Sequence, residues 1–220
     1  EALPAGTWIR LLYLHPDRIT HAFLDFLMST EKILPYLDVP IQHIDDAILV
    51  AMNRSPAGAH IRDIFRYVRD RNPFFALRTT IMVGFPGETE EQFERVLEFL
   101  EEAEIDRVGA FKYSPEEGTQ AALLPNRIPD EICEARYDRL MTLQAEISRE
   151  RNMLFVGKTL PVLVEEVAAN SAWGRSSRDA PEVDGMVCIE DGGGLIPGSV
   201  VEVEITDAAE YDLFGEMARP

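Results

Sequence analysis

The stretch "TTIMVGFPGETEEQF", residues 79–93, decides how the first part of the chain is built. Its first five residues are apolar or β-branched, which suits a buried strand. Gly84, Pro86 and Gly87 then predict a turn, and Thr89 with Gln92 predicts a capped helix start. No Gly-Lys-Ser/Thr and no GxGxxG occurs, so a phosphate cradle is disfavoured. The stretch is either the edge of a cofactor site or a plain strand-to-helix turn.

The composition is that of a globular protein with a strongly acidic balance. The 220 residues suffice for one large or two small domains, and no apolar run is long enough to span a membrane. The net charge of −18 counts against general nucleic-acid binding and favours a basic partner, although solubility alone would also explain it. Cys133 and Cys188 are interpreted as buried structural thiols, which fits a cytoplasmic protein without disulfides.

Residues 1–156 alternate strand-like and helix-like segments, which predicts parallel strands joined by right-handed crossovers. Strands are expected at 8–16, 36–43, 76–83 and 107–115, and helices at 19–29, 45–53, 58–71, after Thr89 and at 130–151. Residues 157–220 instead show short strands between turn residues, typical of a small antiparallel barrel or sandwich. The sequence therefore predicts an α/β fold with a domain boundary at 156/157.

Each expected strand of the first part ends in a loop containing proline. The loops are "LHP", "VPIQH", "GFPGE" and "YSPEEG". Because ligands of parallel α/β proteins bind at the carboxyl ends of the strands, these loops predict one cofactor rim. The alternative is that the prolines only terminate strands. His43 would lie on this rim, although a structural histidine is equally consistent with the pattern, and no histidine has zinc-site spacing.

Four longer motifs resemble the methylthiotransferases of the radical S-adenosylmethionine (SAM) superfamily. They are "YLDVPIQHIDDAILVAMNR", "VGFPGETEEQF", "FKYSPEEGT" and "GRSSRDAPEVDG", and the resemblance covers essentially the whole chain. It implies a partial radical-SAM barrel of β/α units followed by a TRAM barrel. "DAPEVDG" and "AEYDLFGE" are most similar to the branch that adds a methylthio group to an aspartate of a small-subunit ribosomal protein. The tRNA-modifying branch shares the "GFPGET" turn but lacks "DAPEVDG".

The resemblance also implies where the cofactor lies. In the family, the strand rim holds SAM against a 4Fe-4S cluster, and a second 4Fe-4S cluster lies elsewhere. The positions matching that rim, and expected to line the SAM pocket, are Gln42, His43, Arg78, Thr80, Gly84, Tyr113 and Ser114. Gly84 is expected to let adenosine approach the backbone closely. The opening stretch would then be a cofactor edge.

The cysteines depart from the family pattern. The family binds its SAM cluster through CxxxCxxC and its second cluster through three more cysteines, whereas this sequence has two cysteines in total. Because two thiolates cannot hold such a cluster, we expect no metal ligands and no catalytic residue here. The chain is therefore expected to be the C-terminal part of the enzyme, inactive alone.

Charge bears on the partner. Residues 158–220 carry 4 Lys or Arg and 13 Asp or Glu, so half of the net negative charge lies in the expected barrel. This favours a basic ribosomal protein over tRNA as the substrate. Asp179, Glu182 and Asp184, with neighbours such as Glu202, Glu204 and Asp212, are expected to form the docking face, unless Asp179 and Asp184 only cap a turn. A monomer is expected. A non-catalytic binding module is the alternative, and it would show no unpaired sheet edge.

Overall fold

The computed structural model describes residues 3–4, 6–55 and 57–218. Within these residues the chain forms two compact units. One contains residues 11–30 and 37–144, and the other contains 145–220 together with 1–10 and 31–36. This division falls inside a long helix, whereas the domain boundary expected from sequence is at 156/157, which stays a prediction.

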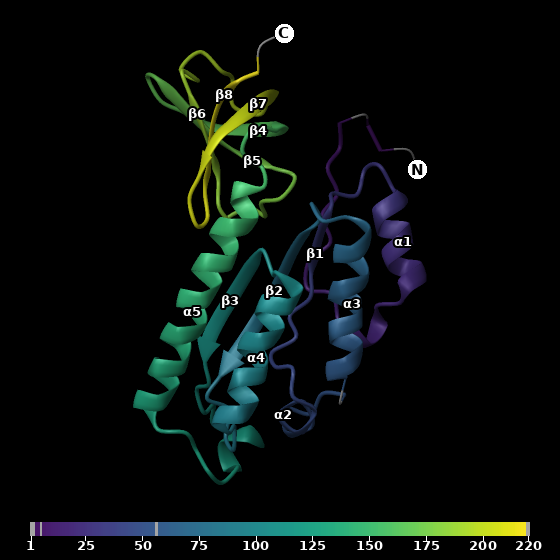
Figure 1. Ribbon diagram of the computed structural model, residues 1–220, viewed down its shortest axis with the longest axis vertical. Coiled ribbons are helices and arrows are strands. Elements are labelled where there is room, and N and C mark those ends of the chain that lie inside the picture. Colours follow the sequence, from purple (N-terminus) through teal and green to yellow (C-terminus); the bar gives the residue numbers. More distant parts are fainter. Residues whose placement is uncertain (1–2, 5, 56, 219–220) are drawn as a thin grey trace. The chain divides into compact units, whose positions relative to one another are not determined.

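A three-stranded parallel sheet is the framework of the α/β part (Figure 1). Its order is β1 (Tyr36–Asp38), β2 (Ala76–Val83) and β3 (Arg107–Lys112), with β2 in the centre. Burial alternates along β2, where Leu77, Thr79, Ile81 and Val83 are buried and the residues between them are half-buried. This is the pattern of a strand whose two faces meet different surroundings.

Helices precede, separate and follow these strands, in the alternation that the sequence predicts. In chain order they are η1 (Pro16–Arg18), α1 (His21–Ser29), α2 (Asp46–Ala51), α3 (Gly58–Arg71), α4 (Glu90–Ala103), η2 (Ala121–Leu123) and α5 (Asp130–Met153). The expected capping box opens α4: the Thr89 hydroxyl accepts from the Gln92 amide, and the Gln92 side chain accepts from the Thr89 amide. Phe65 of α3 and Phe99 of α4 meet edge to face at 5.5 Å.

The strand expected at residues 8–16 is wrong. Only an isolated bridge between Ile9 and Ile33 forms there. Tyr13 adopts a left-handed conformation with φ of 58°, which interrupts an extended chain. The amides of Tyr13 and Leu14 instead donate to the side chain and the carbonyl of Asp38.

The second expected domain is a closed five-stranded barrel. Its strands are β4 (Thr159–Val167), β5 (Ser171–Ser176), β6 (Val187–Glu190), β7 (Val200–Ala208) and β8 (Leu213–Met217), in the order β4-β5-β6-β8-β7. Four pairings are antiparallel, as expected for an antiparallel barrel, whereas β6 and β8 pair in parallel. The reason is geometric, because strand direction cannot alternate around a closed ring with an odd number of strands.

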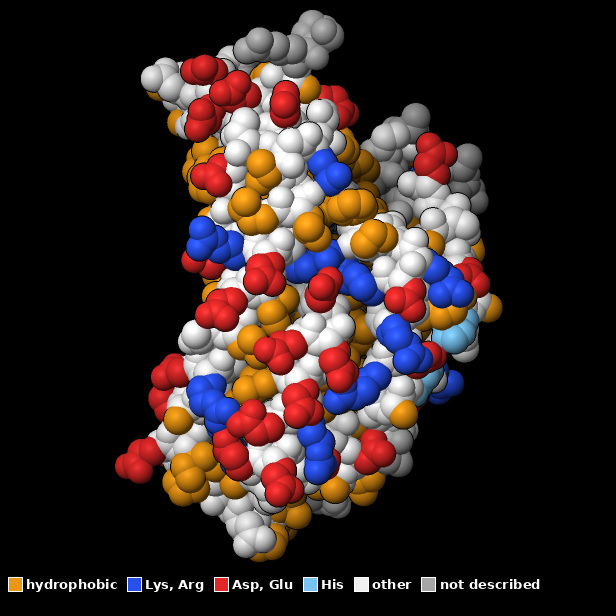
Figure 2. Space-filling view, viewed as in Figure 1, with side chains coloured by type: hydrophobic (Ala, Val, Ile, Leu, Met, Phe, Trp, Pro, Cys, Tyr) orange, Lys and Arg blue, Asp and Glu red, His pale blue; other side chains and the backbone are white. Residues whose placement is uncertain are grey.

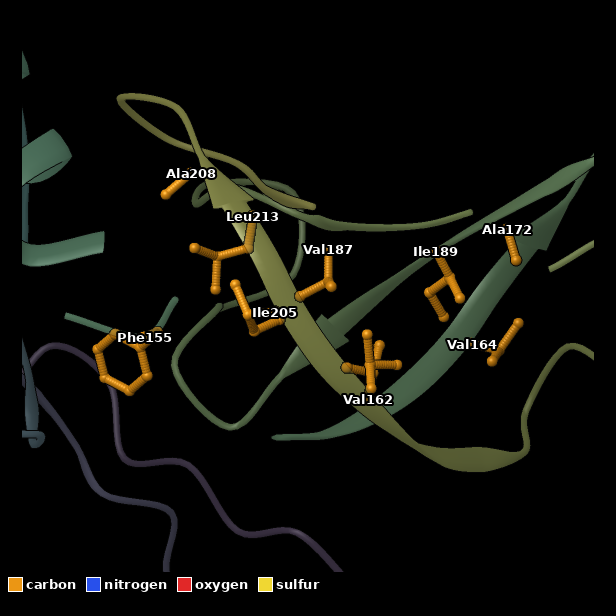
Figure 3. Packing of buried hydrophobic residues seen from close by; sticks show 10 residues of the cluster. Phe155, Val162, Val164, Ala172, Val187, Ile189, Ile205, Ala208 and Leu213 are labelled. Carbon is orange, nitrogen blue, oxygen red and sulfur yellow. The ribbon is translucent and has the colours of Figure 1, made fainter. Parts of the chain in front are cut away.

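The interior of the barrel is an apolar cluster (Figure 3). Val162 and Val164 from β4, Ile189 from β6 and Ile205 from β7 are buried, and Phe155, which follows α5, belongs to the same cluster. Along β7, the exposed Glu202 and Glu204 alternate with the buried Val203 and Ile205. Acidic side chains are prominent on the barrel's surface (Figure 2).

Candidate functional site

A cavity of about 680 Å³ lies at the carboxyl ends of β2 and β3. Its wall is formed by Gln42, residues 51–54, Met82, Phe85 and several residues of 111–121. This is the place where ligands of parallel α/β sheets bind, and the volume suits a small organic molecule. The cavity is the candidate site.

Backbone hydrogen bonds fix three wall residues relative to one another. The Gln42 amide donates to the Thr80 carbonyl (2.8 Å), and the Met82 amide donates to the Gln42 carbonyl (2.9 Å). The Tyr113 amide donates to the Val83 carbonyl at 2.9 Å. Gln42 joins β2 through a parallel bridge at Ile81 and has a positive φ of 70°, which ends the extended segment there.

Two polar atoms of the cavity wall are buried without a hydrogen-bond partner among the described residues. They are Oε1 of Gln42 and the hydroxyl oxygen of Tyr113. Since buried polar groups are normally satisfied, these atoms indicate a place for polar groups of a ligand: Oε1 of Gln42 can accept a hydrogen bond, and the Tyr113 hydroxyl can donate or accept one. Beside them, Phe85 and Tyr113 meet edge to face at 5.3 Å, which gives the cavity an aromatic wall.

Of the seven rim residues predicted from sequence, Gln42, Tyr113 and Ser114 line the cavity. Arg78 and Thr80 do not line it, although they lie on the same half-buried face of β2 as Met82. Arg78 forms an ion pair with the buried Asp38 at 3.1 Å. The assignment of these residues to a SAM pocket stays a prediction.

His43 is fully buried and has structural partners. Its Nδ1 accepts from the Asp45 amide at 2.9 Å, so the ring proton of neutral His43 lies on Nε2, 3.2 Å from Oε1 of Glu88. Glu88 also accepts from the Gly84 amide and from Arg136, each at 2.7 Å. This buried network ties the loop after β1 and the turn after β2 to α5.

Gly84 is constrained by a protein neighbour. Its φ is +76°, and a Cβ there would lie 2.2 Å from Sγ of Cys133 in α5. The turn therefore needs glycine for backbone conformation and for packing against Cys133. A role in approaching adenosine stays a prediction.

Neither cysteine belongs to a metal site among the described residues. Cys133 is buried, and burial with the nearby Glu88 carboxylate raises the pKa of its thiol. Cys188 is half-buried, and burial likewise raises its pKa. Within the described part of the chain, no group of three or more His, Cys, Asp or Glu could hold a metal ion.

The acidic segment after β5 forms its own local contacts. Asp179 is 2% exposed and accepts from the amide (3.1 Å) and hydroxyl (2.6 Å) of Ser176. Asp184 accepts from the Tyr36 hydroxyl at 2.5 Å and from the Ala180 amide at 2.9 Å. Glu182, with a φ of 67°, is exposed. Asp179 and Asp184 thus have the contacts of a capped turn, and a docking role for this segment stays a prediction that rests mainly on Glu182.

Sequence reasoning missed Met82, Phe85, Arg54 and Phe111 as cavity residues. Met82 was within reach, because the period of a strand places it on the face of Arg78 and Thr80. The side chains of 51–54 reach the wall through tertiary packing, for which local sequence carries no signal.

Comparison with known proteins agrees with the fold. Residues 9–100 match the family described as "Radical SAM superfamily", and residues 156–218 match "TRAM domain". No helix within the described residues has the length and apolar character needed to cross a membrane.

Several relatives carry the name "Ribosomal protein uS12 methylthiotransferase RimO". The one from Syntrophotalea carbinolica is 46% identical over 213 residues, covering 96% of this chain and 47% of the relative. Those from Aromatoleum aromaticum and Geobacter sulfurreducens are 47% and 44% identical, covering 98% of this chain and 48% and 49% of the relatives. The chain spans about half the length of these relatives. It therefore carries a region matching the radical SAM superfamily and a TRAM domain, and it is similar over most of its length to relatives named RimO.

Proposed function

We propose that the protein to which this chain belongs adds a methylthio group to an aspartate of a small-subunit ribosomal protein. The observation that carries the proposal is the cavity at the carboxyl ends of β2 and β3, found in a chain 46% identical to a relative named a uS12 methylthiotransferase. The methylthiotransferase relatives give the reaction class, and the cavity gives a place for a small cofactor.

The residues present fit SAM. The unpartnered Oε1 of Gln42 can accept a hydrogen bond, and the Tyr113 hydroxyl can donate or accept one. Met82, Phe85 and Phe111 supply apolar contacts for a purine ring. When bound, SAM would supply radical chemistry and the methyl group of a methylthiotransferase reaction. The role of this chain's residues is to bind and orient that ligand at the sheet's edge.

The residues present do not fit a 4Fe-4S cluster. Cys133 is packed against Gly84, and Cys188 lies in β6 of the barrel. A cluster with one iron open to SAM needs three thiolates, so this chain's cysteines are assigned no ligand role.

The surface charge favours a basic protein substrate over tRNA. Exposed Glu182, Glu202 and Glu204 lie on the barrel unit, which holds 13 acidic and 4 basic residues from 158 to 220. Such a surface repels phosphate and attracts a basic loop. A monomeric, cytoplasmic protein acting without a membrane or a nucleic-acid partner accords with this proposal.

A chimera tests the proposed function. The matching half of the Syntrophotalea carbinolica relative is replaced by residues 1–220, and the chimera is produced in cells lacking their own uS12 methylthiotransferase. Mass spectrometry of uS12 is expected to show a methylthio group on an aspartate, and Gln42→Ala in the chimera is expected to reduce it. A soluble chimera that leaves uS12 unmodified, or that modifies tRNA instead, contradicts the proposal.

A further inference from the structure

Arg54 is a half-buried cation in the wall of the cavity. Its Nη1 donates to the Pro40 carbonyl at 3.1 Å, and its amide donates to the Leu49 carbonyl at 2.8 Å. No carboxylate among the described residues forms an ion pair with it. The other cation of the wall, Lys112, is paired with the exposed Glu134. Arg54 is therefore the cavity cation whose charge is not matched by a protein ion pair.

This environment is unfavourable for an unpaired charge. Burial lowers the pKa of the Arg54 guanidinium, and the Asp17 carboxylate opposes that shift only partly. Asp17 itself accepts from the Ser55 hydroxyl at 2.6 Å. By contrast, the buried or half-buried Arg69, Arg78 and Arg136 each pair with a carboxylate. A desolvated guanidinium lacking such a partner is stabilised when a ligand anion supplies it.

The other residues of the cavity wall indicate which kind of anion would bind beside Arg54. Oε1 of Gln42 needs a donor, and Glu116 also lines the cavity and suits an amino group. One unpaired arginine in a protein with a net charge of −18 suits a singly charged carboxylate better than a multiply charged phosphate. The ligand would therefore combine a carboxylate with nitrogen donors, as amino acids and their derivatives do.

We propose that Arg54 binds a ligand carboxylate in this cavity. If the proposed function holds, that carboxylate belongs either to the amino-acid end of SAM or to the aspartate side chain that receives the methylthio group. Both present the same planar anion to the same guanidinium.

Titration of the isotope-labelled 220-residue chain by NMR, with three probes, tests this inference. S-adenosylhomocysteine carries an adenosyl group and a carboxylate, 5′-methylthioadenosine lacks the carboxylate, and N-acetyl-aspartate amide carries only the side-chain carboxylate. Arg54→Gln is expected to weaken binding of a carboxylate probe roughly ten- to hundredfold and to leave 5′-methylthioadenosine unchanged. Arg54→Lys should retain part of the affinity. Arg127→Gln, at a 60% exposed position outside the cavity wall, is the matched control.

The probes separate the two sources of the carboxylate. A loss confined to S-adenosylhomocysteine assigns Arg54 to the cofactor, and a loss confined to the aspartate probe assigns it to the substrate. The inference is overturned if no carboxylate probe binds the wild-type chain, if Arg54→Gln binds them all normally, or if 5′-methylthioadenosine weakens equally. Modification of uS12 by the chimera is read separately, so the proposed function can stand or fall independently.

Discussion

In the described part of the chain, the barrel is closed and has no edge strand, whereas the parallel sheet is open and has two. Each of the five barrel strands has a neighbour on both sides, whereas β1 and β3 have β2 as their one strand neighbour among the described residues. Closure leaves the barrel without a free edge and with a side-chain-filled interior. The open sheet instead ends in two edge strands, which the alternative of a self-contained binding module does not predict. It also has a cavity at its strand ends.

The interiors of the two regions differ. The barrel interior is an apolar cluster, and the buried charges of that unit, such as Arg178 and Asp179, lie outside this cluster. The α/β unit buries His43, Glu88, Asp38 and Asp106 together with their cationic or hydrogen-bonding partners. Apolar packing is insensitive to pH, but a buried ion pair depends on the charge of both members. Substitutions in the barrel interior should therefore lower the free energy of unfolding mainly through lost side-chain volume. In the α/β unit, substitutions should lower it mainly through lost charge.

The largest effect is expected for Phe155→Ala, which tests the barrel side of the comparison. Phe155 is 3% exposed, and Arg178 lies over its ring at 3.8 Å. Truncation should cost about 3–5 kcal/mol of unfolding free energy through lost burial and a residual cavity. Hydrogen exchange should accelerate in β4–β8 and remain unchanged in β2 and β3. Phe26→Ala, at a 55% exposed position, is the control, and equal acceleration in both regions would break the comparison.

Glu88→Gln is expected to have the next largest effect, on the α/β unit. The substitution keeps the shape but removes the charge that pairs with Arg136 at 2.7 Å, where both side chains are buried. Arg136 still pairs with the half-exposed Glu90 in the variant. The free energy of unfolding should therefore fall by about 3 kcal/mol, which is at the lower end for a broken buried ion pair. Denaturant unfolding followed by hydrogen exchange should place the loss in β2 and α5. Glu94→Gln, on the exposed pair with Arg139, should change little.

Gly84→Ala tests how backbone conformation and packing constrain the turn after β2 in the α/β unit. We expect about 2 kcal/mol of destabilisation, from the left-handed backbone and from the clash with Cys133. Adding Cys133→Ala to the Gly84→Ala chain should remove the destabilisation that comes from the clash. The destabilisation that comes from the left-handed backbone should remain. A double-mutant cycle on denaturant midpoints measures this recovery. Simple additivity of the two substitutions would contradict the packing explanation.

Local signals predicted much of this fold. The apolar, β-branched strand β2 and the capping box at Thr89 and Gln92 form from neighbouring residues, and both lie where the sequence placed them. The left-handed Tyr13 and the parallel β6–β8 pair depend on tertiary context, and sequence missed them. The site divides in the same way. Gln42, Tyr113 and Ser114 reach the cavity from the segments that follow β1 and β3, whereas His43 is hydrogen-bonded to Glu88, 45 residues away.

Asp45→Asn is expected to change the free energy of unfolding least. It tests the contribution of the Asp45 charge separately from that of its hydrogen bonds. Asp45 caps α2 by accepting from the amides of Ala47 and Ile48, and it binds Gln92 and Arg95 of α4. Burial alone would raise the pKa of Asp45, but the hydrogen bonds from Ile48, Gln92 and Arg95 outweigh it and hold the pKa below its ordinary value. Asparagine caps helices about as well as aspartate, so the substitution removes mainly the charge.

The sign of the pH dependence follows from that lowered pKa. The ionised carboxylate stabilises the fold fully above the unfolded value of about 3.9, and this contribution is lost as pH falls through the lower folded pKa. Asp45→Asn should therefore cost about 1 kcal/mol at pH 7 and almost nothing once the pH has fallen below the lowered folded pKa of Asp45. Urea unfolding at several pH values measures the difference, with the 94% exposed Asp130→Asn as control. A cost independent of pH would mean that shape, and not charge, joins α2 to α4, and the α/β unit would then resemble the barrel in its response.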